Sequence, residues 1–315
     1  MKMLGDDFYA NQLSPAARNI YDHFLSVFAS KNISGEYICK VQQHTPRQAI
    51  NDGERAITAL SRDHPELFFL SSRYTVTSRG NTLVFKNLTV YSREQVQRIE
   101  RLLERELFLL TNDVLQYDEW ERERIIYKRI ASRYQYKKHG EHLDYNVVGL
   151  LLREEGVCSA YANMLILALR KAGIACHRVS GGGHAWTMVY INDIPLHCDV
   201  TWESHQGENS IAYSYFNVTS DEIVRDHILS ENALPQCAFK GYGYHRKTGC
   251  YFCSAKAATK HIWASLWRGE KVIRLKTDCP EKIDEIVRKA IQQIPFGNYR
   301  FSINKKQSTA IIIRE

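Results

Sequence analysis

The chain of 315 residues has few of the features that mark several protein classes. Only eight of the 315 residues are cysteine. This fraction, about 2.5%, is far below the roughly 8–10% of a disulfide scaffold. No run approaches the roughly 18 apolar residues of a membrane-spanning helix, and the start, MKMLGDDFYANQLS, lacks the apolar segment of a signal peptide. We therefore expect a cytoplasmic protein, away from membranes and with mostly reduced cysteines. A chain trimmed of its leader would look the same, so a secreted or effector form stays open.

Charge of one sign is also in small excess. Lysine and arginine number 42 against 35 acidic residues, a net charge of +7. The basic residues alternate with acids, as in EWERERIIYKR, which is typical of a solvated helix face rather than a nucleic-acid surface. The 44% of hydrophobic and 24% of charged residues indicate an ordinary globular protein. We expect no nucleic-acid partner.

The secondary-structure pattern divides the chain into three regions. Residues 1–115 are expected to form an N-terminal α/β accessory region, with helices opened by Ser-Pro and Thr-Pro pairs, a hairpin and a charged helix. Residues 116–230 carry the motifs described below, on two helices and on two short strands joined by Asn192-Asp193. Residues 231–315 are expected to be a small C-terminal α/β extension, in which one helix alternates with strands.

Cys158 lies where a catalytic thiol is best placed. Gly156 precedes it, and an apolar helical pattern begins directly after it. Unpaired amides and the helix dipole at a helix N-terminus favour the thiolate, which is the nucleophilic form. A cysteine in an apolar helix is more often a small buried hydrophobic residue, so its function depends on partners elsewhere in the chain.

The two strands of the central region offer those partners. If Asn192-Asp193 form a two-residue turn, Asp199 lies opposite Trp186 on the neighbouring strand. His184 is two residues from Trp186, on the same face. His184 and Asp199 are then diagonal neighbours within side-chain reach. A carboxylate there would accept the imidazole N–H and leave the second ring nitrogen for a thiol.

Three sequence blocks in order resemble the core signature of the transglutaminase-like superfamily of papain-type cysteine enzymes. They are GVCSAYANMLILALRKAGIACHRVSG from Gly156, HAW from His184 and DVTW from Asp199. Segments at 63–68, 215–227 and 242–252 are similar to bacterial members. The resemblance implies an α+β fold with a papain-like transglutaminase core at 116–230, in which a helix bearing the cysteine packs on an antiparallel sheet bearing the histidine and the aspartate.

The resemblance also implies roles for these residues. Cys158 would be the nucleophile, His184 the general base and acid, and Asp199 the orienting carboxylate. The expected function is a cysteine-nucleophile enzyme acting on amide bonds of proteins or peptides through an acyl-thioester, as a protease, deamidase or transglutaminase, with no cofactor. Two alternatives remain: a catalytically silent binding or scaffolding protein of the same fold, and an enzyme acting on another amide, such as a glycan-linked asparagine.

The surroundings of the cysteine are less defined. The backbone N–H of Cys158 is one expected oxyanion donor, and Gln43, Tyr145 and Asn146 are the polar candidates for a second. Asn146 is also a candidate to line the substrate cleft. Three aromatic candidates for the cleft are Tyr161, Trp186 and Trp202. For the two tryptophans, packing in the core is the favoured alternative.

Two further motifs, a C-x-x-C pair and a triglycine run, are candidates for a functional role. Cys250 and Cys253 form a C-x-x-C pair, but zinc would need two more ligands at suitable spacing, and a redox pair would normally open a helix. Packing is the favoured interpretation, and no metal is expected. The triglycine run at 181–183 indicates unusual backbone angles or a close backbone approach, with an anion-binding loop as the alternative.

Overall fold

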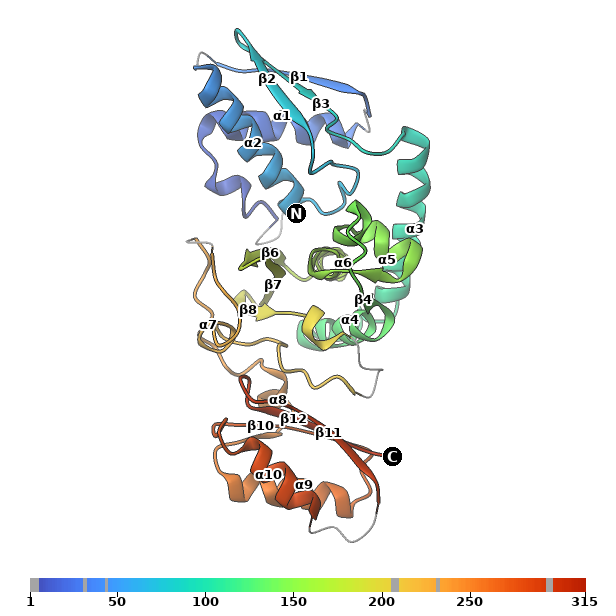
Figure 1. Ribbon diagram of the computed structural model, residues 1–315, viewed down its shortest axis with the longest axis vertical. Coiled ribbons are helices and arrows are strands. Elements are labelled where there is room, and N and C mark those ends of the chain that lie inside the picture. The colour runs from blue at the N-terminus through green and yellow to red at the C-terminus, as the bar shows by residue number, and fades with distance from the viewer. Residues whose placement is uncertain (1–5, 31–32, 43–44, 205–209, 231–232, 293–296) are drawn as a thin grey trace.

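The computed structural model describes residues 6–30, 33–42, 45–204, 210–230, 233–292 and 297–315. The chain forms an elongated molecule with three tiers along its long axis (Figure 1). The N-terminal region lies at one end, the central helices and sheet lie in the middle, and the last strands and helices lie at the other end.

The N-terminal tier is two helices and an antiparallel sheet. Helices α1 (Pro15–Ala29) and α2 (Pro46–Asp63) accompany strands β1 (Glu36–Lys40), β2 (Thr75–Arg79) and β3 (Thr82–Lys86), in the order β1-β3-β2. Both predicted helix starts are confirmed, because Ser14 and Thr45 cap the first turns with their side-chain oxygens. The hairpin β2–β3 is also confirmed, whereas β1 was not predicted.

The central tier surrounds one buried helix, α6 (Cys158–Lys171). Nearly every residue of α6 from Ala160 to Leu169 is apolar and buried, as expected for a helix enclosed on most sides. Around it lie α3 (Arg93–Thr111), α4 (Glu119–Arg133), α5 (Val147–Arg153) and the short parallel pair β4 (Gln135–Tyr136) and β5 (Glu155–Gly156). Strands β6 (Cys176–Gly181), β7 (His184–Ile191) and β8 (Ile194–Cys198) form the antiparallel sheet against which it packs.

The register of β7 and β8 is the one predicted from the turn. Ile191 pairs with Ile194, and both turn residues, Asn192 and Asp193, have positive φ, as a two-residue hairpin turn requires. Asp199, which was expected on the strand opposite Trp186, lies just beyond it, because β8 ends at Cys198 and a 3₁₀ helix, Thr201–Glu203, follows. The reason is local: the Thr201 N–H donates to Asp199 Oδ1 at 2.8 Å, and such a side-chain turn bends the chain.

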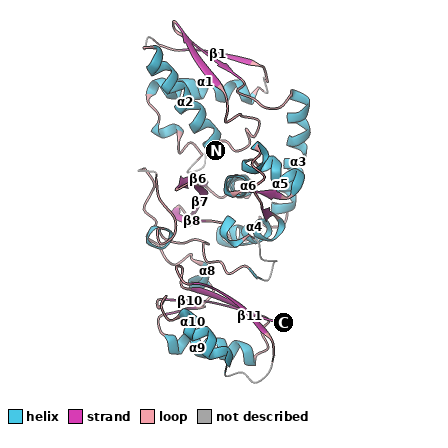
Figure 2. Cartoon of the chain, viewed as in Figure 1, coloured by secondary structure: helices cyan, strands magenta, loops and turns pink. Residues whose placement is uncertain are grey.

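The C-terminal tier is a four-stranded sheet with two helices on one face (Figure 2). Its strands follow the order β11 (Tyr299–Asn304), β12 (Thr309–Arg314), β10 (Val272–Thr277), β9 (Tyr251–Phe252). Helices α9 (Ala255–Trp267) and α10 (Ile283–Gln292) cover the sheet, and α7 (Ser220–Ile223) and α8 (Tyr244–Lys247) lie on the connection from the centre. Within the described ranges, no helix combines the length and the apolar character needed to cross a membrane.

Hydrophobic packing groups these tiers differently from the three predicted regions. One buried cluster runs from Tyr9 to Phe216 and joins the N-terminal and central tiers. A second cluster, from Ala258 to Ile312, belongs to the C-terminal tier alone. The predicted boundary at 115/116 therefore coincides with no break in packing, because α3 packs against α6 across it. Tyr242 and Tyr244 still pack on the first cluster, so the hydrophobic break near the C-terminus lies later than residue 231.

Candidate active site

Local structure places Cys158 at the first position of α6. The chain enters the helix through Gly156, where a Cβ would crowd the side chains of Leu150 and Ala160. The Val157 N–H donates to the Asp144 carbonyl at 2.8 Å. Val157 is the N-cap residue and makes no side-chain cap. The first-turn amides, including that of Cys158, therefore point out of the helix end with no capping side chain, as an oxyanion site requires.

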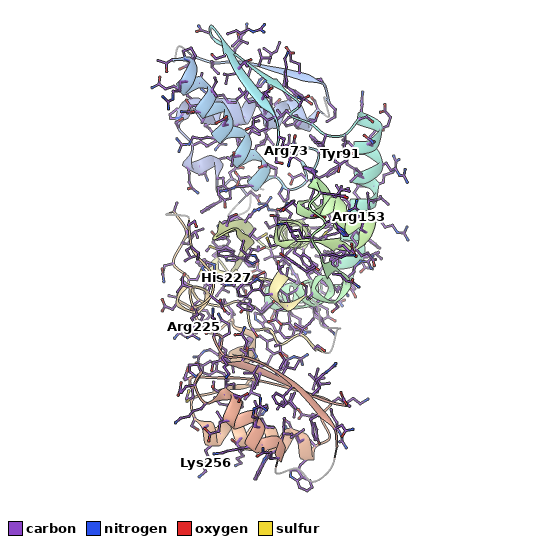
Figure 3. All side chains as sticks on the ribbon, in the orientation of Figure 1. Arg73, Tyr91, Arg153, Arg225, His227 and Lys256 are labelled. Atoms are coloured by element: carbon purple, nitrogen blue, oxygen red, sulfur yellow. The ribbon has the colours of Figure 1, made fainter. Side chains whose placement is uncertain are left out.

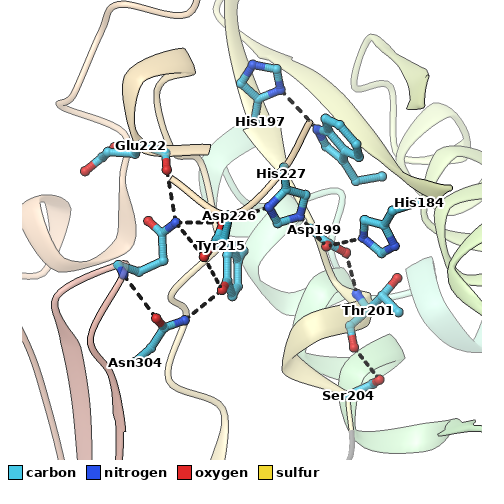
Figure 4. Close-up of polar contacts among 12 residues, drawn as sticks. His184, His197, Asp199, Thr201, Ser204, Tyr215, Glu222, Asp226, His227 and Asn304 are labelled. Atoms are coloured by element: carbon cyan, nitrogen blue, oxygen red, sulfur yellow. Dashed lines mark hydrogen bonds and ion pairs between the residues drawn. The ribbon is translucent and has the colours of Figure 1, made fainter. Parts of the chain in front are cut away.

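His184 and Asp199 meet on one face of the sheet, as the register predicted. His184 Nε2 lies 2.7 Å from Asp199 Oδ2 (Figure 4). The Asp199 carboxylate is completely buried, and 19% of the His184 side chain is exposed. Because an ionised carboxylate only accepts, Nε2 carries a proton and Nδ1 is left for the Cys158 thiol, which lies close enough for each group to shift the pKa of the other.

The electrostatics of these three residues favour an ion pair. Burial by itself raises the pKa of Cys158, but the hydrogen bond and charge of His184, the Ala185 amide and the charge of Arg178 together lower it below its usual value. Burial likewise opposes the charge of His184, but Asp199 and Cys158 raise the pKa of His184 to about 10. Both shifts act in the direction of a thiolate facing an imidazolium.

The aromatic candidates have different positions. Trp202 is 43% exposed, and its ring centre lies 5.5 Å from that of His184, at the edge of the site. Trp186 is buried; its ring stacks on His184, and its Nε1 donates to His197 Nδ1 at 3.1 Å. The prediction that Tyr161 lines the cleft is wrong. Its side chain is fully buried and packs edge-on against Tyr134, because α6 is enclosed on the face it shares with Cys158.

Two of the polar candidates, Tyr145 and Asn146, line a cavity. Both groups of the Asn146 amide are occupied, since Oδ1 accepts the Val148 N–H and Nδ2 donates to the Phe68 carbonyl at 2.6 Å. Tyr145 is half exposed beside it. Gln43 lies outside the described residues. Sequence reasoning missed Tyr136 on β4, whose pKa is raised by burial and by the charge of Cys158, so its hydroxyl is within electrostatic reach of the thiolate.

That cavity, of about 1010 Å³, opens between the N-terminal and central tiers. Ser159 and Asn163 of α6 and Arg178 of β6 form one wall. The segment from His64 to Tyr74 forms the other. Figure 3 shows Arg73 at this junction. Because Ser159 follows Cys158 directly, the cavity reaches the end of the helix that bears the thiol.

Two site residues were not predicted, Asp226 and His227. His227 Nε2 lies 3.0 Å from Asp199 Oδ2, and the His227 side chain is fully buried. These two residues end the segment 215–227, which was noted for its resemblance but assigned no role. A second signal was the triglycine run. A Cβ at Gly181 would collide with the carbonyl oxygen of Ile228, and Gly182 and Gly183 have positive φ. The structure therefore supports both the close approach and the unusual backbone angles expected for that run.

The remaining motifs contribute no ligand set. Among the described residues, the group of potential metal ligands that converges is His184, Asp199 and His227, with one atom of each within 4.8 Å of the others. Their contacts of 2.7 and 3.0 Å are hydrogen bonds to one shared oxygen, and we assign no metal to them. All eight cysteines are free. Cys250 is buried beside the Thr248 hydroxyl and Cys253 is exposed.

A comparison with protein families supports the sequence resemblance. The model described as the transglutaminase-like superfamily matches residues 110–202, the stretch that holds Cys158, His184 and Asp199. The chain carries a transglutaminase-like core. Members of this superfamily are generally cysteine enzymes, and the α+β fold class expected from the sequence is confirmed.

Two other comparisons add little to this transglutaminase-like assignment. One similar solved structure is titled "Crystal structure of a TGase", with 12% sequence identity and a TM-score of 0.27. The similarity covers 42% of this chain and 44% of that one, so less than half of the other chain is matched. A comparison with curated proteins finds no match.

Proposed function

We propose that this protein is a cysteine-nucleophile enzyme that acts on amide bonds of proteins or peptides through an acyl-thioester. The observation that carries the proposal is the convergence of three groups: Cys158 at a helix N-terminus, His184 close enough that the two groups shift each other's pKa, and buried Asp199 at 2.7 Å from the imidazole Nε2. This is the arrangement of nucleophile, base and orienting group that covalent acyl transfer needs.

In the first half of the reaction, Cys158 Sγ attacks the amide carbonyl carbon. The carbonyl oxygen takes up the displaced electron pair and accepts a hydrogen bond from the Cys158 backbone N–H. When this intermediate collapses, the C–N bond breaks, and His184 Nδ1 gives its proton to the departing nitrogen. An acyl-thioester on Cys158 and a free amine or ammonia remain.

In the second half, an acceptor attacks the thioester. His184, now neutral, takes the acceptor's proton as the new bond to carbon forms, and the C–S bond breaks to restore the thiolate. Water gives hydrolysis or deamidation, and a primary amine gives transfer. Asp199 keeps the imidazole in one orientation through both halves and stabilises its charged form.

The proposal is tested by mass spectrometry of peptide libraries incubated with the protein, with and without a primary amine. We expect cleavage, deamidation or amine incorporation, and the product identifies the acceptor. Cys158→Ala should abolish every conversion, whereas Cys253→Ala, which changes an exposed cysteine, should not. Absence of any conversion by the wild-type chain would favour the binding-protein alternative.

Thiol labelling tests the nucleophile without a substrate. At pH 6 an ordinary thiol with a pKa near 8.5 is less than about 1% ionised, while Cys158 has a lowered pKa. Limited iodoacetamide should therefore modify Cys158 before the other seven cysteines, and His184→Ala should slow that reaction. Labelling of denatured protein gives the total thiol count. Labelling of Cys253 ahead of Cys158 would contradict the assignment.

Asp199→Asn tests the orienting role. Asn can hold the imidazole in the wrong tautomer, and in a comparable triad that change lowers kcat by about 10⁴. We expect a folded protein with a loss on that order. A variant that retains most of its activity would remove Asp199 from the proposal.

A further inference from the structure

Asp199 is shared by two imidazoles. Its Oδ2 lies 2.7 Å from His184 Nε2 and 3.0 Å from His227 Nε2, and its Oδ1 accepts the Thr201 N–H at 2.8 Å. Despite burial, the hydrogen bonds and charges of His184 and His227 lower the pKa of Asp199 to about 2. The function proposed above uses only one of the two imidazoles.

We infer that His227 and Asp226 are positioning residues that hold Asp199 against His184, and that the C-terminal tier keeps them in place through Gln307. Figure 4 shows the chain of contacts that leads from His184 through Asp199 and His227 to Asp226. The consequence for catalysis rests on the function proposed above, whereas the arrangement itself can be tested without a substrate.

The His227 ring lies between two carboxylates. Its Nε2 faces Asp199 at 3.0 Å and its Nδ1 faces Asp226 Oδ1 at 2.8 Å. Each ionised carboxylate can only accept, so both contacts are hydrogen bonds only when both ring nitrogens carry protons. His227 is therefore an imidazolium. Burial opposes its charge, but the two aspartates outweigh burial and raise the pKa of His227.

The groups around His227 agree with a positive charge there. The Trp202 ring centre lies 4.2 Å away and that of Tyr215 5.4 Å away, and aromatic faces stabilise cations. The titratable groups that face His227 come from β7, from β8 and the residue after it, and from the 215–226 segment: His184, His197, Asp199, Tyr215 and Asp226. Burial and the charge of His227 lower the pKa of His197 to about 3, so His197 is neutral.

Asp226 is held from the opposite side by the C-terminal tier. Gln307 Nε2 donates to Asp226 Oδ1 and Oδ2 at 3.1 and 3.2 Å and to the Glu222 carbonyl at 3.0 Å. Tyr215 donates to Asp226 Oδ2 at 2.8 Å, and Asn304 Nδ2 donates to the Tyr215 hydroxyl. Asp226 thus accepts hydrogen bonds from His227, Tyr215 and Gln307, and the glutamine comes from another tier.

Gln307 is built into a buried turn. It lies between β11 and β12, and it is fully buried, as are Ser308 and Thr309. Its backbone N–H donates to Asn304 Oδ1 at 3.0 Å, which fixes the turn that aims its side chain. On the other side, Gly181 allows the Ile228 backbone to lie against β6. The Asp226–His227 pair is therefore clamped between the central sheet and the C-terminal hairpin.

The Asp226–His227 pair has a defined electrostatic effect on the candidate site. The positive charge of His227 offsets part of the charge of Asp199, so Asp199 orients His184 with a moderated attraction for its proton. Replacing His227 by glutamine removes a positive charge whose ring centre lies 5.3 Å from that of His184. The ionisations of both Cys158 and His184 should then shift upward, each on the order of one pH unit.

The arrangement is tested by NMR of the ring nitrogens in the full-length protein labelled with ¹⁵N-histidine. The ring-nitrogen signals of His227 are identified as those that disappear in the His227→Gln variant. We expect both His227 nitrogens to be protonated from pH 6 to pH 8, with slowly exchanging N–H protons. Asp226→Asn, which preserves volume, should leave one ring nitrogen unprotonated. Gln307→Leu should speed exchange of the Nδ1 proton, while Ser302→Ala, exposed on the same hairpin, should not.

The coupling to catalysis is tested by the pH profile of Cys158 alkylation by iodoacetamide. The profile has two limbs, one set by ionisation of Cys158 and one by ionisation of His184. Both limbs should move to higher pH in His227→Gln and Asp226→Asn. Gln307→Leu should lower the alkylation rate severalfold, and Ser302→Ala should leave it unchanged. A merely structural role would change protein yield or melting temperature without moving the limbs.

Separate results would overturn the two proposals. An unprotonated His227 nitrogen in the wild-type protein at pH 7, or a Gln307→Leu variant that behaves like Ser302→Ala, would overturn this inference. A wild-type protein that converts no amide substrate, yet keeps both His227 protons and the shifts described, would overturn the proposed function and support the positioning arrangement.

Discussion

The two flanks of the central tier are attached to it in different ways. The N-terminal tier shares one hydrophobic cluster with the centre, from Tyr9 to Phe216. The C-terminal tier has its own cluster, and its contacts with the centre are largely polar. They include Lys276 with Glu222 at 2.7 Å, Thr309 with Ser214 at 2.6 Å, Arg274 with the Ile211 carbonyl at 2.7 Å, and Gln307 with Asp226.

This difference distinguishes a flank that stabilises the central tier from a flank that can alter the electrostatics of the candidate site. Apolar contact is non-directional and depends on area, so the N-terminal tier can stabilise the centre and wall its cavity without addressing a particular group. Polar contact depends on direction and transmits charge. Residues 211–227, which we call the docking segment, receive the polar contacts of the C-terminal tier and also end in His227. Hydrogen bonds such as Tyr9 Oη to the Arg178 carbonyl also join the N-terminal tier to the centre, but the C-terminal tier is the flank whose polar contacts lead through Asp226 and His227 to Asp199.

Phe24→Ala is the strongest test of the shared cluster. Phe24 is completely buried, and its ring packs on those of Phe85, Phe28 and Tyr37. Loss of a buried phenylalanine side chain costs about 3–5 kcal/mol. We expect the free energy of unfolding to fall by that amount, with the N-terminal tier and α6 unfolding in one transition, as measured by denaturant titration with fluorescence and Cys158 labelling.

Phe108→Ala is the matched control. Phe108 is 56% exposed on α3, so its removal should change the free energy of unfolding by less than about 0.5 kcal/mol. If Phe24→Ala loosened only the N-terminal tier, with Cys158 labelling still following the wild-type transition, the two tiers would be separate units and the comparison would fail.

Lys276→Met tests the polar attachment. The side chains of Lys276 and Glu222 are 8% and 13% exposed, and removing one partner of such a pair leaves a charge with little solvent. We expect a cost of about 2–4 kcal/mol, expressed as looser docking of the C-terminal tier. Hydrogen exchange should accelerate in β10 and β12 and stay unchanged in α6.

The double variant Lys276→Met/Glu222→Gln sharpens this result. It removes both charges, so it should recover most of the stability lost in the single variant. Equal losses in the single and double variants would show that packing of the lysine stem, rather than the ion pair, holds the two tiers together.

Sequence reasoning succeeded where the information was local. The caps at Ser14 and Thr45 form as predicted. The two-residue turn at Asn192-Asp193 and the strand period bring His184 and Asp199 to one face. It failed for Tyr161, because the face of a helix that carries the nucleophile can itself be enclosed by other helices.

The contacts of Asp226 and His227 are non-local. His227 is 28 residues from Asp199, and Gln307 is 81 residues from Asp226. No periodicity or spacing in one sequence relates such positions, since their meeting depends on how the C-terminal hairpin docks. Two features of the sequence bear on this region, the resemblance of segment 215–227 and the close approach that Gly181 permits, and neither identifies the partners of Asp226 and His227.

Glu123→Gln is the smallest expected effect, and it tests how the docking segment is held from the central side. Glu123 of α4 is completely buried and accepts a hydrogen bond from Asn217 Nδ2 at 2.6 Å. Burial raises the pKa of Glu123 to about 8, against the opposing hydrogen bonds of Asn217 and Cys198. Asp199 is equally buried, but the hydrogen bonds and charges of His184 and His227 lower its pKa to about 2, so these two buried carboxyls hold opposite protonation states near neutral pH.

The sign of the pH dependence follows from that raised pKa. Below an ordinary glutamate pKa of about 4.5, both the folded and unfolded states keep the proton. Between that value and about 8, the unfolded state releases the proton and the folded state retains it, so stability falls as pH rises. Glutamine removes this penalty. We expect Glu123→Gln to match the wild type near pH 4.5 and to exceed it by about 1–2 kcal/mol at pH 8, measured by denaturant unfolding. Glu104→Gln, on the exposed side of α3, should show no such trend, and a Glu123→Gln variant that gains nothing as pH rises would mean that Glu123 is ionised in the folded protein and held by donors as Asp199 is.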